Sequence, residues 1–115
     1  MGRDYRAYLL HILDSIGLIE KYVEGLSFEE FAGDQKTIDA VIRNLEIIGE
    51  ASSKLPRDFR ERYPDVPWRS IIGLRNILIH NYMGVDVEAV WGNIKKDIPL
   101  LKEHIKSIVE KEGAA

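Results

Sequence analysis

The feature that most constrains this chain is the recurrence of apolar residues at steps of three and four. Residues at such steps share one face of an α-helix, so long runs of them predict amphipathic helices. The first run predicts a helix from about Asp4 to Glu24. Its apolar stripe consists of Tyr5, Tyr8, Leu9, Ile12, Leu13, Ile16, Ile19 and Val23.

Two further long helices follow from the same spacing. Asp34 is suited to cap one that carries Ile38, Val41, Ile42, Leu45, Ile48 and Leu55 and stops at Pro56. Asp86 can cap the last one, whose apolar residues Val87, Trp91, Ile94, Ile98, Leu101, Ile105 and Ile108 form a heptad seam. Pro99 lies inside this seam and removes a backbone donor, so a kink or a fresh helix start is expected near 95–99.

Shorter elements connect these helices. Ser27 with Glu29 and Glu30 predicts a turn of helix that ends near Gly33. A short charged helix is expected over 57–63, and Pro67 is placed as the first residue of a fourth long helix that ends at Gly84. No stretch shows the alternation of apolar and polar residues that a half-buried strand would have. The sequence therefore predicts an all-α fold, a four-helix, up-and-down type bundle with short extra helices, in a single domain spanning residues 1–115.

Composition narrows the classes of function. The 115 residues include no cysteine, which excludes disulfides and thiolate metal sites, and no run is apolar enough to cross a membrane, so we expect a cytoplasmic protein. The formal net charge is −3, so any nucleic-acid site must be local. The best candidate track is 54–75, with six basic residues against three acidic ones, although a solvated charged turn would have the same composition.

The helix predicted from Trp68 to Tyr82 carries the polar residues best suited to catalysis or ligand binding. Its apolar residues lie on more than one face, which indicates a central position in the bundle or a subunit contact. Arg75 falls inside the apolar stripe, where an unpaired charge is costly, so it needs an anion. That anion is either Glu46 or Glu50 in a structural ion pair, or a substrate phosphate, which the planar guanidinium fork suits.

His80 lies five residues after Arg75, with Asn76 one turn before it and Asn81 beside it. An imidazole titrates near neutrality, as general acid and base catalysis requires, but a lone histidine at a helix end is more often a cap or a surface residue. On an ideal helix Arg75 and His80 are about 140° apart, so they converge only if the helix loosens or if two subunits contribute to one cleft. Tyr82 by itself is typical of a core or interface aromatic residue.

These residues carry a family resemblance that spans nearly the whole chain. The segment from Arg75 through His80 to Tyr82 matches the Arg-x4-His-x-Tyr pattern of HepT-like toxins. The surroundings match too, namely the segments 43–51, 67–69, 84–86 and 90–91. The chain thus resembles HepT-type ribonuclease toxins of the HEPN superfamily.

The resemblance implies a metal-independent endoribonuclease that acts as a homodimer through its motif helix, with no cofactor. Arg75 would hold the scissile phosphate and His80 would move protons, while Asn76 and Asn81 would orient the ring or the phosphate. It also implies a toxin–antitoxin pair in which an MntA-type minimal nucleotidyltransferase antitoxin adenylylates Tyr82.

Three other readings stay open. A non-catalytic bundle could bind a nucleotide or dock the nucleotidyltransferase, and a purely structural dimerisation module would be favoured if Arg75 were locked in an ion pair. A metal hydrolase is poorly supported because His11, His80 and His104 share no ligand spacing.

Overall fold

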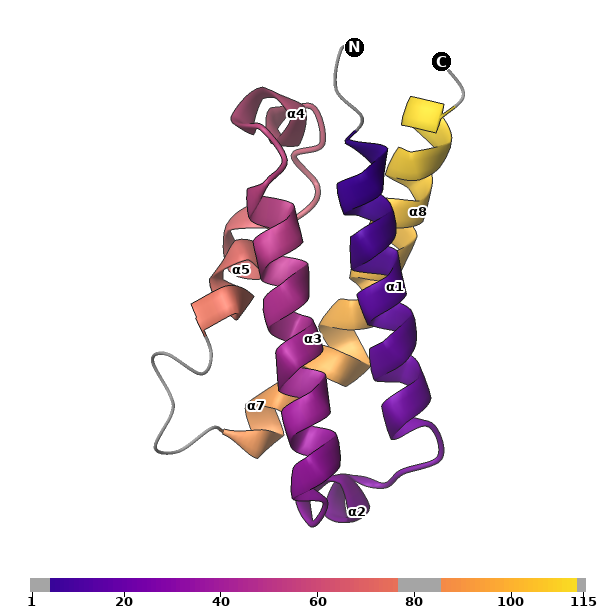
Figure 1. Cartoon of the computed structure of the whole chain (residues 1–115), viewed down its shortest axis with the longest axis vertical. Helices are drawn as coiled ribbons and strands as arrows, with labels where there is room; N and C mark the ends of the chain where they lie inside the picture. Colours follow the sequence, from indigo (N-terminus) through magenta and orange to yellow (C-terminus); the bar gives the residue numbers. More distant parts are fainter. Residues whose placement is uncertain (1–4, 77–85, 114–115) are drawn as a thin grey trace.

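A computed structural model describes residues 5–76 and 86–113, and these form an all-α bundle as predicted. Its long helices are α1 (Arg6–Val23), α3 (Gln35–Ser53) and α8 (Ile98–Gly113). Figure 1 shows α1 and α3 running antiparallel, with α8 beside α1 and with the start of α1 and the end of α8 at the same end of the bundle. The predicted apolar stripes face inward, where Leu9, Ile12, Ile16, Ile19, Val41, Leu45, Ile48 and Ile105 are fully buried. Tyr8 is the exception, because its side chain lies on the exposed side of α1.

The predicted helix starts are confirmed by their caps. Ser27 and Glu30 form a reciprocal capping box at the start of α2 (Phe28–Ala32). Asp34 accepts hydrogen bonds from the hydroxyl and the backbone N–H of Thr37, and these bonds lower the pKa of its carboxyl group. Asp86 accepts from the N–H of Ala89 and so begins α7 (Val87–Gly92). Local side-chain chemistry therefore sets where these helices begin.

The irregularity predicted around Pro99 is also present. Between α7 and α8 the chain forms one π-helical segment, Asn93–Asp97, and Figure 1 shows the chain changing direction there. Proline has no backbone N–H, so the carbonyl of Lys95 loses its usual partner four residues on, and the helix widens locally. Ile94 and Ile98 stay buried across the change, which keeps the apolar seam continuous.

Two short helices, α4 (Arg57–Glu61) and α5 (Trp68–Gly73), pack at the end of α3. Trp68 is buried, and its indole N–H donates to the carbonyls of Arg60 and Tyr63, at 3.1 and 3.0 Å. The Tyr63 hydroxyl donates in turn to Glu112 near the end of α8. Burial, together with this hydrogen bond, raises the pKa of Tyr63. Trp68, the first residue of α5, thus ties α5 to α4 and to the turn that follows α4.

The structure shifts some predicted boundaries. The α3 helix ends at Ser53 rather than at Pro56, and Pro67 caps α5 instead of being its first residue. The segment predicted as one α-helix from 67 to 84 changes at Leu74 into a 3-10 helix, η1 (Leu74–Asn76), and its remainder lies outside the described residues. Over the described ranges, no helix is both long and apolar enough to cross a membrane.

Replacing Trp68 with phenylalanine should destabilise the fold by about 1–2 kcal/mol, because the part-buried hydrogen bonds from its indole N–H to two carbonyls are lost. Urea unfolding followed by circular dichroism measures this. The matched control is Trp91→Phe, because Trp91 makes ring contacts with Phe28 and Phe31 but no hydrogen bond through its indole N–H among the described residues. An equal loss in the two variants would show that ring size, not the hydrogen bonds of Trp68, matters.

Candidate functional site

The site is built on a close contact between α3 and the backbone of α5 and η1. A Cβ atom placed on Gly49 would lie 2.6 Å from the backbone nitrogen of Arg75, 2.9 Å from the carbonyl oxygen of Ile71 and 3.1 Å from that of Ile72. Real side chains essentially never approach other atoms so closely, so only glycine fits at position 49. This contact fixes the backbone that carries Arg75 against the C-terminal part of α3.

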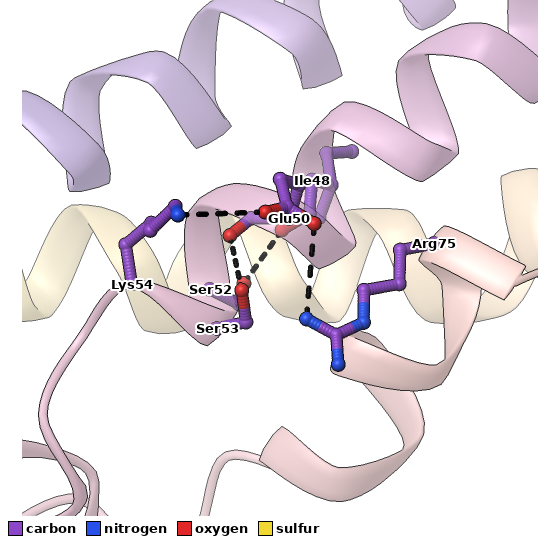
Figure 2. Close-up of polar contacts among 6 residues, drawn as sticks. All are labelled: Ile48, Glu50, Ser52, Ser53, Lys54 and Arg75. Atoms are coloured by element: carbon purple, nitrogen blue, oxygen red, sulfur yellow. Dashed lines mark hydrogen bonds and ion pairs between the residues drawn. The ribbon is translucent and has the colours of Figure 1, made fainter.

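Arg75 points along α3 toward Glu50, as Figure 2 shows. Its Nη1 lies 3.7 Å from Glu50 Oε2, and the other Glu50 oxygen, Oε1, lies 3.7 Å from Lys54 Nζ. Of the two partners predicted for Arg75, the structure therefore selects Glu50. Glu50 is shared between two cations, Lys54 at the C-cap of its own helix and Arg75 on η1.

The predicted burial of Arg75 is wrong, because 42% of its side chain is exposed. That expectation extended a straight α-helix through position 75, whereas the chain tightens to a 3-10 helix at Leu74, which changes the direction of later side chains. The backbone of Arg75, not its guanidinium, fills the contact with α3 at Gly49. The charge therefore stays in water and needs no buried partner.

The ion pair between Arg75 and Glu50 is weak. Both side chains are about half exposed, and pairs of this kind contribute roughly 0–1 kcal/mol. Such a pair holds the guanidinium near α3 and can be exchanged for another anion at little cost. Arg75 is therefore placed on the surface and oriented, but it is not locked.

The structure places only part of the predicted site. Asn76 follows Arg75 directly at the end of η1 and is half-buried. His80, Asn81 and Tyr82 lie outside the described residues, so their relation to Arg75 stays a prediction.

Two hollows flank α5 on different sides. One, of about 440 Å³, lies between α5 and α8, and its lining includes Leu74, Asp97 and His104. The other, of about 530 Å³, lies between α4 and α5, and we call it the arginine hollow. It is lined by Arg57, Arg60, Glu61, Pro64, Trp68, Arg69 and Ile72. Three of the six basic residues of the predicted 54–75 track thus surround one depression, while Arg75 lines neither hollow.

Gly49 was not among the site residues predicted from the sequence. A glycine in the interior of a strongly amphipathic helix weakens that helix by about 1 kcal/mol relative to alanine, and this cost is itself a signal of close packing. The identity of the approaching segment could not be read from that signal.

Comparison with known proteins identifies the family. The family model described as "Ribonuclease HepT-like" matches residues 12–108, which is most of the chain. This chain belongs to the HepT-like ribonuclease family. It is 49% identical over 102 residues to a protein of Thermococcus cleftensis named "Probable ribonuclease HepT", and the match covers 89% of this chain and 93% of that one.

Other relatives carry similar names. A Caldanaerobacter subterraneus subsp. tengcongensis protein named as a "Putative RNase" is 46% identical, over 93% of this chain and 96% of its own. A Methanocaldococcus jannaschii protein named both as a gamma-glutamylcyclotransferase and as a "putative RNase" is 48% identical over 96% of this chain. The match covers only 50% of that longer protein. No solved structure matches the chain.

Gly49→Ala should destabilise this HepT-like fold by about 1–3 kcal/mol, because α5 and η1 must move away from α3 to admit the methyl group. Thermal and urea unfolding measure the loss. Gly17→Ala is the matched control, since a Cβ there meets nothing within 4 Å, and it should instead stabilise α1 by about 0.5–1 kcal/mol. Equal effects of the two substitutions would contradict the packing role of Gly49.

Proposed function

We propose that this chain is a metal-independent endoribonuclease that acts as a homodimer, with Arg75 and His80 as its catalytic residues. The observation that carries the proposal is the placement of Arg75. Its backbone packs against α3, and its guanidinium is half exposed and, among the described residues, paired only with the weakly held carboxylate of Glu50. In a chain that belongs to a ribonuclease family, such a guanidinium is well suited to exchange Glu50 for an RNA phosphate.

In this mechanism Arg75 binds the scissile phosphate and stabilises the negative charge that gathers on it during the reaction. Arginine suits this role because its planar fork matches two phosphate oxygens and its charge does not titrate away. A donor fixed in advance needs no rearrangement at the moment of reaction, and this is the main source of electrostatic catalysis. The packing of the Arg75 backbone against Gly49 would limit the region that its guanidinium can reach.

His80 would act in proton transfer. The ribose 2′-hydroxyl loses its proton to a base and attacks the adjacent phosphorus, while the bond to the 5′-oxygen breaks and that oxygen takes a proton from an acid. The products are a 2′,3′-cyclic phosphate and a 5′-hydroxyl. A cleft that holds His80 from both subunits would supply the base and the acid, and Asn76 and Asn81 would orient the imidazole or the phosphate.

The same family resemblance supports a regulatory role for Tyr82. We propose that the chain is the cytoplasmic toxin of a toxin–antitoxin pair and that its partner, an MntA-type minimal nucleotidyltransferase, transfers adenylate to the Tyr82 hydroxyl. The added phosphate would compete for Arg75 and repel RNA. Adenylylation would therefore switch the nuclease off.

A non-catalytic bundle is the second candidate, and the acidic net charge of −3 favours it. In that reading the Arg75–Glu50 pair is structural, and the polar cluster binds a nucleotide or docks the nucleotidyltransferase without cutting RNA. The two candidates differ in what they predict for substitutions at position 50 and at the motif residues.

Arg75→Ala and His80→Ala should each lower RNA cleavage by about 10²–10⁴-fold, since each removes a group that acts in the transition state. Cleavage of total cellular RNA is measured with EDTA present, on partner-free protein whose intact mass shows no adenylate. Lys106→Ala on α8 is the charge control and should cut as the unsubstituted protein does. The proposed mechanism would be contradicted if EDTA abolished cleavage by the unsubstituted protein, or if the His80 variant kept full activity.

Glu50→Gln separates the two candidates. If Glu50 only occupies Arg75 until RNA arrives, the variant should bind RNA about two- to fivefold more tightly and lose less than about 1 kcal/mol of stability. Affinity is measured with a 2′-O-methyl oligonucleotide, which cannot be cut by this mechanism. The control is Glu20→Gln, which removes a comparably exposed ion pair with Lys102. A large loss of stability with unchanged affinity would favour the structural role.

A further inference from the structure

The arginine hollow is a concave surface with a local excess of positive charge. Arg57 and Arg60 approach it from α4 and Arg69 from α5, while Glu61 is the one acidic residue among its lining residues. Trp68 and Ile72 form its apolar part. With a volume of about 530 Å³, the hollow is large enough for a phosphate group and its attached sugar.

The walls of the hollow are held in place by hydrogen bonds. Arg60 Nε donates to the Leu55 carbonyl at 3.1 Å, which ties its guanidinium to the turn after α3. The Trp68 indole then donates to the Arg60 carbonyl, so that α4 and α5 keep their relative positions. A site whose groups are ordered before binding loses less conformational entropy when a ligand arrives.

The charges in the hollow are available to an anion. Arg57 pairs with Glu61 at 3.4 Å, but the two side chains are 89% and 68% exposed, so the pair exchanges readily with a phosphate. Arg69 is exposed and, within the parts of the chain that the structure describes, makes no ion pair. Three arginines and a single acidic residue thus line one hollow.

This excess of positive charge contrasts with the rest of the molecule. The segment 54–75 has three more basic than acidic residues in a chain of net charge −3, so the remaining residues carry six excess negative charges. A polyanion would be repelled by most of the surface and attracted here. Electrostatic attraction would therefore favour this end of the bundle for a polyanion.

The α5 wall of the hollow continues along the chain into η1, which carries Arg75. Arg69 precedes Arg75 by six residues, which is roughly 9 Å along the helix at about 1.5 Å per residue. Ile72 lies between them, lines the hollow, and packs its carbonyl close to Gly49. The axial separation of the two arginines is therefore about the length of one or two nucleotides, so a single RNA strand is long enough to contact both.

We propose that the arginine hollow binds the sugar–phosphate backbone of single-stranded RNA beside the cleavage site, with Arg57, Arg60 and Arg69 as the phosphate ligands. This inference rests on the proposed ribonuclease function and adds a substrate-binding site to it. Phe59 and Trp68 are buried, so neither offers a face for base stacking. The hollow therefore holds RNA through its phosphates and with little dependence on base sequence.

The test is binding of the full chain to a fluorescent 2′-O-methyl oligonucleotide, followed by anisotropy at several salt concentrations. The variants are Arg57→Gln, Arg69→Gln and the two combined. The double variant should raise Kd by about tenfold or more, and each substitution should reduce the salt dependence of log Kd by about 0.7, the value for one lost contact to a single strand. Lys106→Gln is the control, and it should leave both quantities unchanged.

Each result has a distinct meaning. Unchanged affinity in the double variant, with its fold verified by circular dichroism, would overturn the proposal and would point to a protein ligand for the hollow. An equal loss in Lys106→Gln would also overturn it, because the effect would then be one of overall charge. If binding depends on the hollow but the unsubstituted chain cuts no natural RNA, the hollow stands and the proposed nuclease function fails.

Discussion

The close approach of the α5–η1 backbone to Gly49 is the contact on which the arrangement of the site depends. A Cβ at position 49 would lie 2.6 Å from the Arg75 nitrogen, so the absence of a side chain there allows two helical segments to meet through their backbones. That contact leaves the guanidinium of Arg75 on the surface beside Glu50. The same segment carries Arg69 and Ile72 to the arginine hollow. The contact at Gly49 therefore positions the segment that carries both the proposed catalytic arginine and part of the arginine hollow.

The distribution of charge explains how an acidic protein could act on RNA. Arg75 and Arg57 each pair with an exposed carboxylate at 3.7 and 3.4 Å, and neither pair is strong enough to exclude a phosphate. Phosphates that replace these carboxylates gain charge-assisted hydrogen bonds without dismantling the fold. The stability of the bundle comes instead from its apolar core, in which Phe31, Phe59 and Leu45 are almost fully buried.

The sequence predicts the helices well because their signals are local. Apolar spacing marks the buried faces, Ser27, Asp34 and Asp86 cap the helices that follow them, and Pro99 follows the π-helical segment. The exposure of Arg75 could not be predicted in this way. It depends on the change to a 3-10 helix at Leu74 and on which segment packs against Gly49, and both are consequences of tertiary packing. The basic track was visible as composition, but its concave shape requires Trp68 to hold α4 against α5.

The chemistry of the RNA ends produced by the chain tests the central claim most directly. Partner-free protein is incubated with a defined RNA in the presence of EDTA, and the fragments are identified by mass spectrometry. Attack by the 2′-hydroxyl, with Arg75 on the phosphate and His80 in proton transfer, predicts fragments with a 2′,3′-cyclic phosphate at one end and a 5′-hydroxyl at the other. Fragments with 5′-phosphate and 3′-hydroxyl ends, or cleavage that appears only when a divalent metal is added, would contradict it.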